Sequence, residues 1–232
     1  MRLLIVTQKP DSASFRQRIE VHLPSLHQRD CVCEVAGLPT GVSKRRELWM
    51  RARSFDAVLL HRKTLGLSDA AWLKRSGVKV IYDFDDAIVY KDSRPERRSR
   101  RRQRRFRRSV RLADLVLAGN SYLAEHARRF NSNVAILPTG LDTKAYARPA
   151  TRENDGLVRL VWIGSHSTLK YLGQLAPVLE ELGRRVPKVV LRIVCDVFFD
   201  LQSMRMEKRK WSPERQVIEL VTSDLSLIHI SE

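Results

Sequence analysis

Short apolar runs alternate with amphipathic stretches from the N-terminus to Leu137. The apolar runs are strand-length and mostly lack the regular polar alternation of a strand with one solvent-exposed face. We predict strands at residues 3–6, 32–36, 57–60, 78–82, 115–118 and 134–137. Strands of this kind are covered by helices on both faces, which is typical of a parallel sheet.

The stretches between these strands space their apolar residues as helices do. They predict helices over 15–26, 43–53, 68–75, 95–112 and 121–130, with Ser68 and Ser121 as N-caps. The alternation of strand and helix predicts an α/β fold with a doubly wound parallel sheet. Ligands of such sheets bind at the carboxyl ends of the strands, so the residues that follow each strand are the functional candidates.

The pattern stops at a polar segment that contains Pro149 and Gly156. It restarts with a strand over 158–163, a helix over 168–185 and a strand over 189–194. We therefore predict a first domain over 1–147, a linker over 148–156 and a partial second domain over 157–224.

The last residues, 225–232, complete no unit and resemble a translated sequencing-adapter tail. We expect a non-native tail on a chain that is truncated at its C-terminus. Because an incomplete sheet exposes an edge and leaves apolar faces unburied, we also expect aggregation, or local disorder after about Asp196.

The chain is basic, with 43 Lys and Arg against 26 Asp and Glu, and its formal net charge is +17. The segment Arg94–Arg111 concentrates this charge, with eleven arginines and one acid, Glu96. It predicts a solvated helix face, a surface that contacts anionic lipid or a phosphorylated acceptor, or a nucleic-acid site. Phe106 is the only aromatic residue in it, which does not favour nucleic acid.

Cys31, Cys33 and Cys195 complete neither a zinc site nor a disulfide framework. We interpret them as structural thiols in a reducing compartment. No apolar run reaches the ~18 residues of a membrane span, and none resembles a signal peptide. We expect a cytoplasmic protein that is at most peripheral to the inner membrane face.

An acidic motif, Tyr82–Asp86, stands where ligands bind in such a sheet. Its candidates Asp85 and Asp86 could orient sugar hydroxyls, act as acid or base, or hold a divalent ion. They could equally cap a helix and pair with the arginines that follow.

A glycine turn follows the first strand of the second domain. Gly164 permits a tight turn, and Ser165 and Thr168 are suited to capping the next helix. A helix N-terminus attracts phosphate, and Lys170 could add a full charge. An ordinary capped helix with a surface lysine remains the alternative.

Several other polar residues lie at the same edge of the first sheet. Arg16 and Arg18 follow its first strand, and His61 and Arg62 follow its third. Each could meet an anionic acceptor or simply lie at the surface. His166 has no partner in the sequence that would make it catalytic.

Four segments resemble a known family. Residues 134–142 (VAILPTGLD) resemble the hinge-side segment v-x-x-i-P-N-G-v-D of retaining "group 1" glycosyltransferases with a GT-B fold, with Thr139 at the usual Asn. Residues 120–123 (NSYL) are similar to the helix start before that segment. Residues 81–88 (IYDFDDAI) and 162–172 (WIGSHSTLKYL) resemble motifs of one branch of this superfamily.

The resemblance implies a GT-B architecture of two Rossmann-like domains, the first for the acceptor and the second for a nucleotide-diphosphate sugar. It implies that Lys170 and the Gly164 turn contact the donor pyrophosphate, although Ser165 stands where many relatives have Arg. The family reaction retains the anomeric configuration and generally needs no metal, so no cofactor or metal is expected. The donor-binding E-x7-E segment is expected beyond Asp224.

Three hypotheses follow. In the first, the intact protein is a glycosyltransferase that moves a sugar from a UDP- or GDP-sugar to a polysaccharide or lipid-linked acceptor. Its candidates are catalytic Asp85 and Asp86, phosphate-binding Gly164, Ser165, Thr168 and Lys170, and acceptor-side Arg16 and Arg18. The second is a basic module that docks on nucleic acid or an anionic membrane. The third is another sugar-nucleotide enzyme of the same architecture, such as an epimerase.

Overall fold

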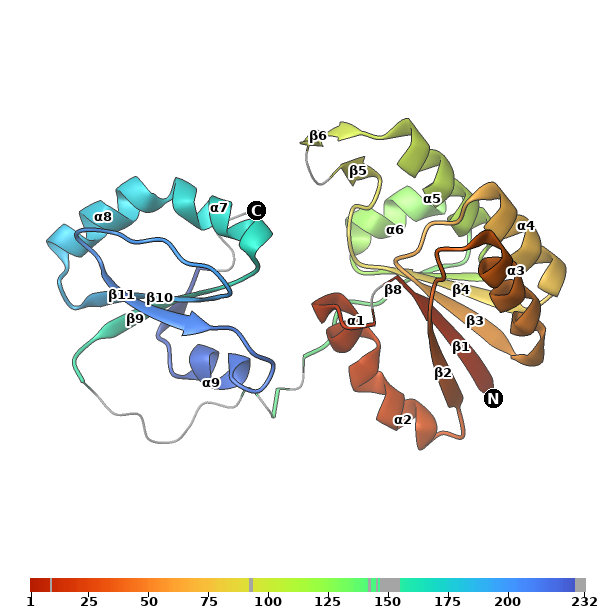
Figure 1. The fold of residues 1–232 in the computed structure, drawn as a ribbon, viewed down its shortest axis with the longest axis horizontal. Coiled ribbons are helices and arrows are strands. Elements are labelled where there is room, and N and C mark those ends of the chain that lie inside the picture. The colour runs from red at the N-terminus through yellow and green to blue at the C-terminus, as the bar shows by residue number, and fades with distance from the viewer. Residues whose placement is uncertain (9, 92–93, 142, 145, 147–154, 228–232) are drawn as a thin grey trace. The chain divides into compact units, whose positions relative to one another are not determined.

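The computed structural model describes residues 1–8, 10–91, 94–141, 143–144, 146 and 155–227, with the backbone alone for 91 and 94–98. It forms two compact units, residues 1–141 and 142–232, called here the first and second unit (Figure 1). Residues 148–154 of the predicted linker lie outside the described residues. Each unit is built on a parallel sheet, as the apolar runs predict.

The sheet of the first unit has six parallel strands in the order β2-β1-β3-β4-β7-β8. These are β1 (Arg2–Thr7), β2 (Val32–Gly37), β3 (Ala57–His61), β4 (Lys79–Phe84), β7 (Leu115–Ala118) and β8 (Val134–Ile136). Because all six run the same way, their carboxyl ends meet at one edge.

Helices cover both faces of this sheet. They are α1 (Ala13–Arg18), the 3-10 turn η1 (Glu20–His22), α2 (Leu23–His27), α3 (Val42–Arg51), the 3-10 turn η2 (Ala52–Ser54), α4 (Leu67–Ser76), α5 (Arg100–Leu112) and α6 (Ser121–Arg128). Leu4 and Val6 of β1 belong to the core shared with α3 to α6, whereas Leu3 and Ile5 pack on the α1–α2 side. This alternation follows from the two-residue period of a strand.

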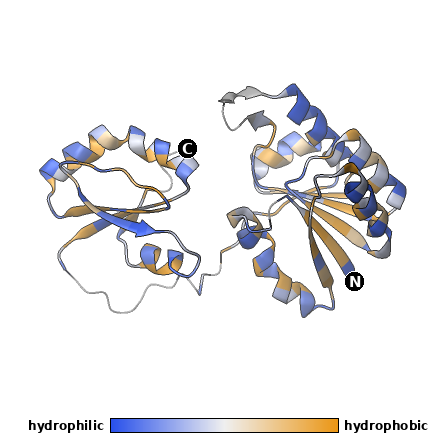
Figure 2. Cartoon of the chain, viewed as in Figure 1, coloured by the Kyte–Doolittle hydropathy of each residue, from blue (hydrophilic) through white to orange (hydrophobic). Residues whose placement is uncertain are grey.

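The second unit has four parallel strands in the order β11-β10-β9-β12. Its elements are β9 (Val158–Ile163), α7 (His166–Gln174), α8 (Ala176–Arg185), β10 (Val189–Cys195), β11 (Arg205–Lys210), α9 (Gln216–Val221) and β12 (Leu225–Ser226). Trp162, Leu191 and Ile193 pack against Leu172 and Leu179 of α7 and α8. Figure 2 shows β9 and β10 as largely apolar strands.

The other face of β10 carries a buried charge. Arg192 is 6% exposed; its Nε donates to Glu207 at 2.8 Å, its Nη1 donates to Thr222 at 2.7 Å, and it lies 3.3 Å from Glu219. These partners come from β11, α9 and the residue after α9. The expectation of local disorder after about Asp196 therefore differs from the structure, in which β11, α9 and β12 form and α9 and β11 satisfy Arg192.

The segment predicted as a non-native tail, residues 225–232, begins inside the fold of the second unit. Leu225 and Ser226 pair with β9 as the edge strand β12. Residues 228–232 lie outside the described residues.

Two predicted helices are broken. The stretch 15–26 consists of α1, η1 and α2, and Pro24 lies at the start of α2. The stretch 168–185 divides at Leu175, just before Pro177 at the start of α8. Proline lacks a backbone N–H and fixes φ, so it begins a helix more readily than it continues one.

Both predicted serine caps are wrong. The N-cap of α4 is Gly66, which makes no side-chain bond, and Ser68 lies within the helix. Asn120 caps α6 instead of Ser121, and its side chain accepts a hydrogen bond from Leu123 N at 2.9 Å. Asn competes well with Ser at this position.

The helix predicted from Pro95 begins later, at Arg100. Ser99 is its N-cap, and the preceding strand β6 (Arg94–Arg98) pairs antiparallel with β5 (Tyr90–Lys91). A residue before proline avoids the helical region, which favours the extended start.

Candidate functional site

Polar side chains converge at the carboxyl edge of the first sheet. Thr7 ends β1, and His61 ends β3 beside Asp83 of β4. Asp85 and Asp86 follow β4 directly. The predicted acidic motif therefore lies at the ligand edge of the sheet, among polar groups from three strands.

The innermost pair of this cluster is Arg18 and Asp83. Nε of Arg18 donates to both carboxylate oxygens, at 2.9 and 2.8 Å, and Nη2 donates to Oδ1 at 2.7 Å. Nη1 donates to Leu137 O at 2.8 Å and to Thr139 Oγ1 at 3.3 Å. Burial raises the pKa of Asp83, and the hydrogen bonds from Arg18 oppose this rise.

The two predicted acceptor-side arginines differ in their surroundings. Arg18 is 4% exposed, so its charge is held inside the protein by Asp83. Arg16 is half-buried and donates to Asp11 O at 2.7 Å. The structure therefore places Arg18 behind the site rather than at its surface.

His61 is buried between β1 and α1. Its Nδ1 lies 3.1 Å from Thr7 Oγ1, and its Nε2 lies 3.3 Å from Ser14 Oγ. Its ring and that of Phe15 form a T-shaped pair, with 5.7 Å between the ring centroids. Burial lowers the pKa of His61 to about 4, although the charge of Asp85 acts in the opposite direction. His61 is therefore neutral at pH 7 and serves as a hydrogen-bonding group.

Asp85 and Asp86 are held from two sides. Ser14 Oγ donates to Asp85 Oδ2 at 3.0 Å. Arg62 lies 3.3 Å from Asp85 Oδ1 and also pairs with Asp86. Arg62 has a φ of 55° and its N–H donates to Asp83 O at 2.7 Å. A non-glycine residue in this left-handed region is uncommon, and here the turn aims the guanidinium at both carboxylates.

Gly119 presses on the same acidic segment. A Cβ at this position would lie 2.9 Å from the Cα of Asp85, and the Gly119 N–H donates to Phe84 O at 2.9 Å. Sequence reasoning missed Ser14 and Gly119 as site residues. Their positions after β1 and β7 were the available signal, but no pattern shows which loop meets Asp85.

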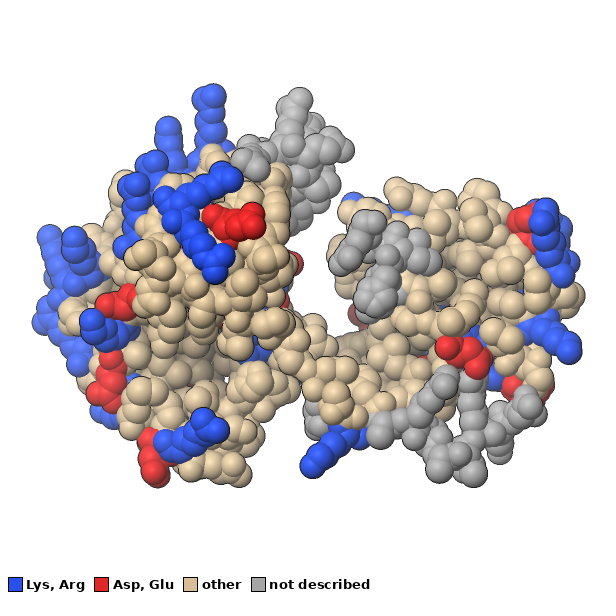
Figure 3. Space-filling view, turned by 180° about the vertical axis from the view of Figure 1, so that it is seen from behind, with Lys and Arg blue, Asp and Glu red and all other residues tan. Residues whose placement is uncertain are grey.

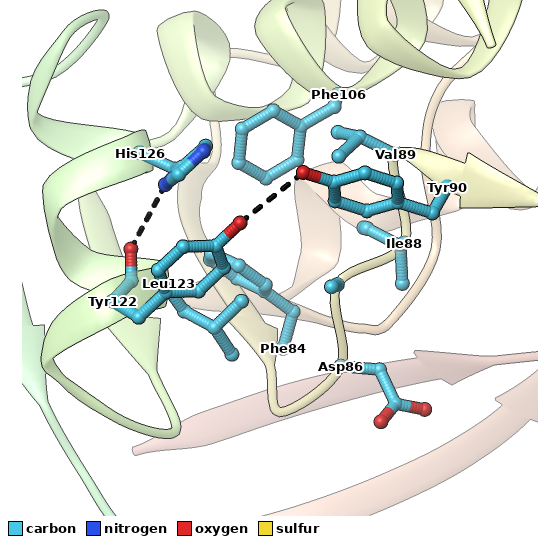
Figure 4. Close-up of a pocket in the computed structure, with 10 residues that line it drawn as sticks. Phe84, Asp86, Ile88, Val89, Tyr90, Phe106, Tyr122, Leu123 and His126 are labelled. Atoms are coloured by element: carbon cyan, nitrogen blue, oxygen red, sulfur yellow. Dashed lines mark hydrogen bonds between the residues drawn. The ribbon is translucent and has the colours of Figure 1, made fainter. Parts of the chain in front are cut away.

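A small apolar pocket lies beside the acidic segment (Figure 4). The hydroxyls of Tyr90 and Tyr122 are 3.2 Å apart, and Nδ1 of His126 lies 3.0 Å from Tyr122 O. The pocket has a cavity volume of about 10 Å³, which leaves no room for a ligand. Figure 4 shows the carboxylate of Asp86 pointing away from the aromatic side chains.

In the second unit, the glycine turn lies between β9 and α7. A Cβ on Gly164 would lie 2.5 Å from the Trp162 ring and 2.9 Å from Thr168 Oγ1, so the turn requires glycine. Ser165 and Thr168 form a capping box, in which Ser165 N donates to Thr168 Oγ1 at 3.0 Å. The structure thus brings Gly164, Ser165 and Thr168 together at one helix N-terminus.

Lys170 lies in the second turn of α7 and is exposed. Its ammonium lies 4.9 Å from the ring centroid of Tyr171, a cation–π contact. Among the described residues, the backbone N–H groups of His166 and Ser167 have no acceptor. This helix end therefore combines free donors, the positive end of the helix dipole and an exposed cation nearby.

Helix α5 carries most of the described part of the Arg-rich segment. Phe106 and Val110 are buried, whereas the opposite face exposes Arg100, Arg101, Arg104, Arg107 and Arg111. Figure 3 shows Lys and Arg side chains gathered on the first unit, to which α5 belongs. Within the ranges that the structure describes, no helix is long and apolar enough to cross a membrane, and no three His, Cys, Asp or Glu side chains are placed to hold a metal ion.

Three solved structures are similar to this chain. HepE from Anabaena, in complex with UDP, is 15% identical with a TM-score of 0.65, and the match covers 97% of this chain and 73% of that one. MurG from Acinetobacter baumannii is 12% identical with a TM-score of 0.58, over 97% and 71% of the two chains. A putative UDP-N-acetylglucosamine 2-epimerase from Listeria monocytogenes is 11% identical with a TM-score of 0.56, over 97% and 73%. A search among curated proteins gave no significant match.

At these identities the similarity shows the GT-B fold alone, and it does not distinguish a transferase from an epimerase. A family model does distinguish them. The model described as Glycosyltransferase Family 4 matches residues 2–145, which is more than half of the chain. The chain therefore belongs to Glycosyltransferase Family 4 and is a nucleotide-sugar glycosyltransferase.

Proposed function

We propose that this glycosyltransferase moves a sugar from a UDP- or GDP-sugar to a glycan or lipid-linked acceptor, with retention of the anomeric configuration. The solved structures of HepE with UDP and with UDP-glucose support a nucleotide-sugar donor of this kind. The new bond from the acceptor oxygen forms on the face of the sugar from which the diphosphate departs.

The observation that carries the donor assignment is the N-terminus of α7. Gly164 allows the close turn, and the Ser165–Thr168 capping box holds the first helical turn in place. Negative charge grows on the diphosphate as its bond to the sugar breaks. Free N–H groups, the helix dipole and Lys170 stabilise this charge, and such preorganised stabilisation lowers the barrier.

The acceptor side of the reaction belongs to the first unit. Asp85 is partly exposed and Asp86 is largely exposed, so both can accept hydrogen bonds from sugar hydroxyls. Ser14 donates to Asp85, and Arg62 pairs with both carboxylates. Arg16 is the acceptor-side arginine that remains near the surface. Arg18 acts indirectly in this proposal, since it fixes Asp83 behind them.

The exposed arginines of α5 add a membrane-facing surface to the same enzyme. Each basic residue near an anionic bilayer contributes about 1 kcal/mol of attraction, so this face of α5 favours docking where lipid-linked acceptors lie. We place the enzyme at the inner membrane face on this argument.

Calorimetric titration of the purified protein with UDP and with GDP tests the donor assignment. We expect one of them to bind, and Lys170→Ala to weaken that binding about tenfold, the value of one charge-assisted hydrogen bond. Lys188→Ala is the matched control, because Lys188 is also exposed but precedes β10 at the opposite edge of the sheet. Equal losses in the two variants contradict the assignment of Lys170.

The stereochemical part of the proposal needs a separate measurement. The anomeric proton coupling in the NMR spectrum of the first product, before mutarotation or exchange, reports its configuration. A product with the configuration of the donor supports retention, and the opposite configuration rejects it.

A further inference from the structure

Three half-buried cations from separate segments of the first unit lie close enough for the charges of two of them to act on the third. Arg45 belongs to α3, Lys63 to the loop after β3, and Arg105 to α5. Nothing in the proposed donor or sugar chemistry uses them. Partly buried cations are costly unless negative charge compensates them, so their grouping calls for an anion.

The loop that carries Lys63 is hydrogen-bonded to α5. Leu65 N donates to Ser109 Oγ at 2.8 Å, and Arg108 Nη1 donates to Leu65 O at 2.9 Å. Arg105 is three residues before Arg108 and four before Ser109, so all three share one face of the helix. This geometry directs Arg105 toward the loop, near Lys63.

One carboxylate, Asp69, lies among the three cations. It is 4% exposed and accepts a hydrogen bond from Trp49 Nε1 at 3.1 Å and another from Arg45 at 3.4 Å. Among the described side chains, neither Lys63 nor Arg105 has an acidic partner within ion-pair distance. Asp69 therefore leaves a surplus of positive charge.

Two further observations indicate this surplus of positive charge. Burial lowers the pKa of Lys63, and the charges of Arg105 and Arg45 lower it further, against the effect of Asp69. Nε of Arg45 is buried and has no hydrogen-bond acceptor in the part of the chain that the structure describes. A bound anion would relieve the repulsion and accept this donor.

We propose that Arg45, Lys63 and Arg105 bind a phosphate group of the acceptor. A phosphate offers several charged oxygens, which suits cations that approach from three elements. Lys63 directly follows Arg62, the partner of Asp85 and Asp86, so the phosphate would lie next to the sugar-binding carboxylates. The inference rests on the proposed function and makes its acceptor a phosphorylated one.

Chemical labelling of lysine amines tests the site with inorganic phosphate as the probe. We expect phosphate to slow acetylation of Lys63 by acetic anhydride about tenfold relative to chloride of equal ionic strength, as a charge-assisted contact implies. Lys74 is exposed on α4 and is the internal control, which we expect to be unaffected. Equal effects on both lysines, or none on Lys63, overturn the proposal.

Neighbouring arginines of α5 provide a matched pair of variants. Arg105→Gln should raise the phosphate concentration that gives half-maximal protection of Lys63 about tenfold. Arg104→Gln should change this concentration less than about twofold, because Arg104 is exposed on another face of the helix. Circular dichroism establishes that both variants are folded. Equal behaviour of the two variants rejects a specific site.

Vesicles distinguish the two sources of phosphate. Protection of Lys63 by phosphatidylcholine vesicles that contain phosphatidic acid, but not by phosphatidylcholine alone, supports a lipid-linked phosphate. Protection by inorganic phosphate without any effect of either vesicle supports a soluble phosphorylated acceptor. UDP and GDP titrations of the same samples report the donor site separately, so failure of the phosphate site leaves the donor assignment intact.

Discussion

Arg18 and Asp83 form a bidentate ion pair in the interior of the first unit, although 65 positions separate them in the chain. Arg18 also donates to Leu137 O and Thr139 Oγ1. One guanidinium therefore joins α1, the end of β4 and the segment after β8. Ser14 of α1 and Asp85 after β4 belong to the candidate acceptor site, so this pair helps to hold two of its segments together.

Arg18→Met is expected to lower the free energy of unfolding by about 3–5 kcal/mol, because it leaves the Asp83 carboxylate buried and unpaired. Urea denaturation at pH 7 measures this change. Arg16→Met should cost less than about 1 kcal/mol, since Arg16 is nearer the surface.

A double variant, Arg18→Met with Asp83→Leu, separates the two contributions to this loss. It removes both charges, and we expect it to be more stable than Arg18→Met alone. A double variant that is less stable than the single one would show that the ion pair itself, rather than the stranded charge, accounts for the loss.

His61 should make the first unit less stable in mild acid. Its pKa falls from 6.5 to about 4 on folding, so below pH 6.5 the unfolded chain takes up a proton that the folded protein excludes. The contribution is complete above pH 6.5 and is lost as the pH falls toward 4, by at most about 3 kcal/mol.

Urea denaturation between pH 4.5 and pH 7, with His61→Gln as the comparison, measures this contribution. Gln does not titrate, so the variant should lose less stability than the wild type over this range. Its stability at pH 7 should be lower, because the contacts with Thr7 and Ser14 are disturbed. Parallel pH profiles would contradict the buried neutral imidazole.

Substitutions at Asp85 test the acceptor side of the proposed reaction. Asp85→Asn should lower kcat about 100-fold through lost charge, and Ser14→Ala about tenfold through loosened positioning of that carboxylate. Initial rates with the donor identified by titration give both values. Asp11→Asn alters an exposed carboxylate and should change kcat less than about twofold. An unchanged rate in Asp85→Asn removes this residue from the reaction.

Two helical glycines of the second unit should respond in opposite ways to alanine. A Cβ on Gly183 would lie 2.2 Å from Ser203 O, whereas nothing lies within 4 Å of a Cβ on Gly173. Gly183→Ala should lower the free energy of unfolding by about 1–3 kcal/mol through overpacking. Gly173→Ala should raise it by about 0.4–1 kcal/mol, since alanine favours helices.

Thermal melting of the two alanine variants measures both effects against the wild type. A Gly183→Ala variant as stable as the wild type would show that α8 can move away from the Ser203–Met204 segment at little cost.

Much of the fold follows from local pattern. The apolar runs at residues 3–6, 57–60 and 158–163 are strands because such runs can be buried on both faces only inside a covered parallel sheet. Helix boundaries were less predictable. Pro24 and Pro177 divide stretches whose apolar spacing is continuous, since backbone geometry there outweighs periodicity.

The candidate site could also be predicted only in part. Asp85 and Asp86 could be selected as candidates because they directly follow a predicted strand, and the capping residues Ser165 and Thr168 follow another. Arg18 could also be selected because it follows a predicted strand, but no signal in the sequence indicated that it is buried. Its sequence neighbours indicate a surface residue of an amphipathic helix, and only its distant partner explains its burial.

By itself, the sequence determined the alternation of strand and helix, the parallel sheets and the edge at which the candidate residues of the first unit lie, because these depend on residue type and on spacing between near neighbours. The tertiary structure alone decided the pairing of Arg18 with Asp83, the contact of Ser14 with Asp85 and the grouping of Lys63 with Arg105. Each depends on segments far apart in the chain that meet only when the sheet forms. Packing of the whole unit determines which of these segments come into contact. It also buries His61 and Lys63, and this burial lowers their pKa values.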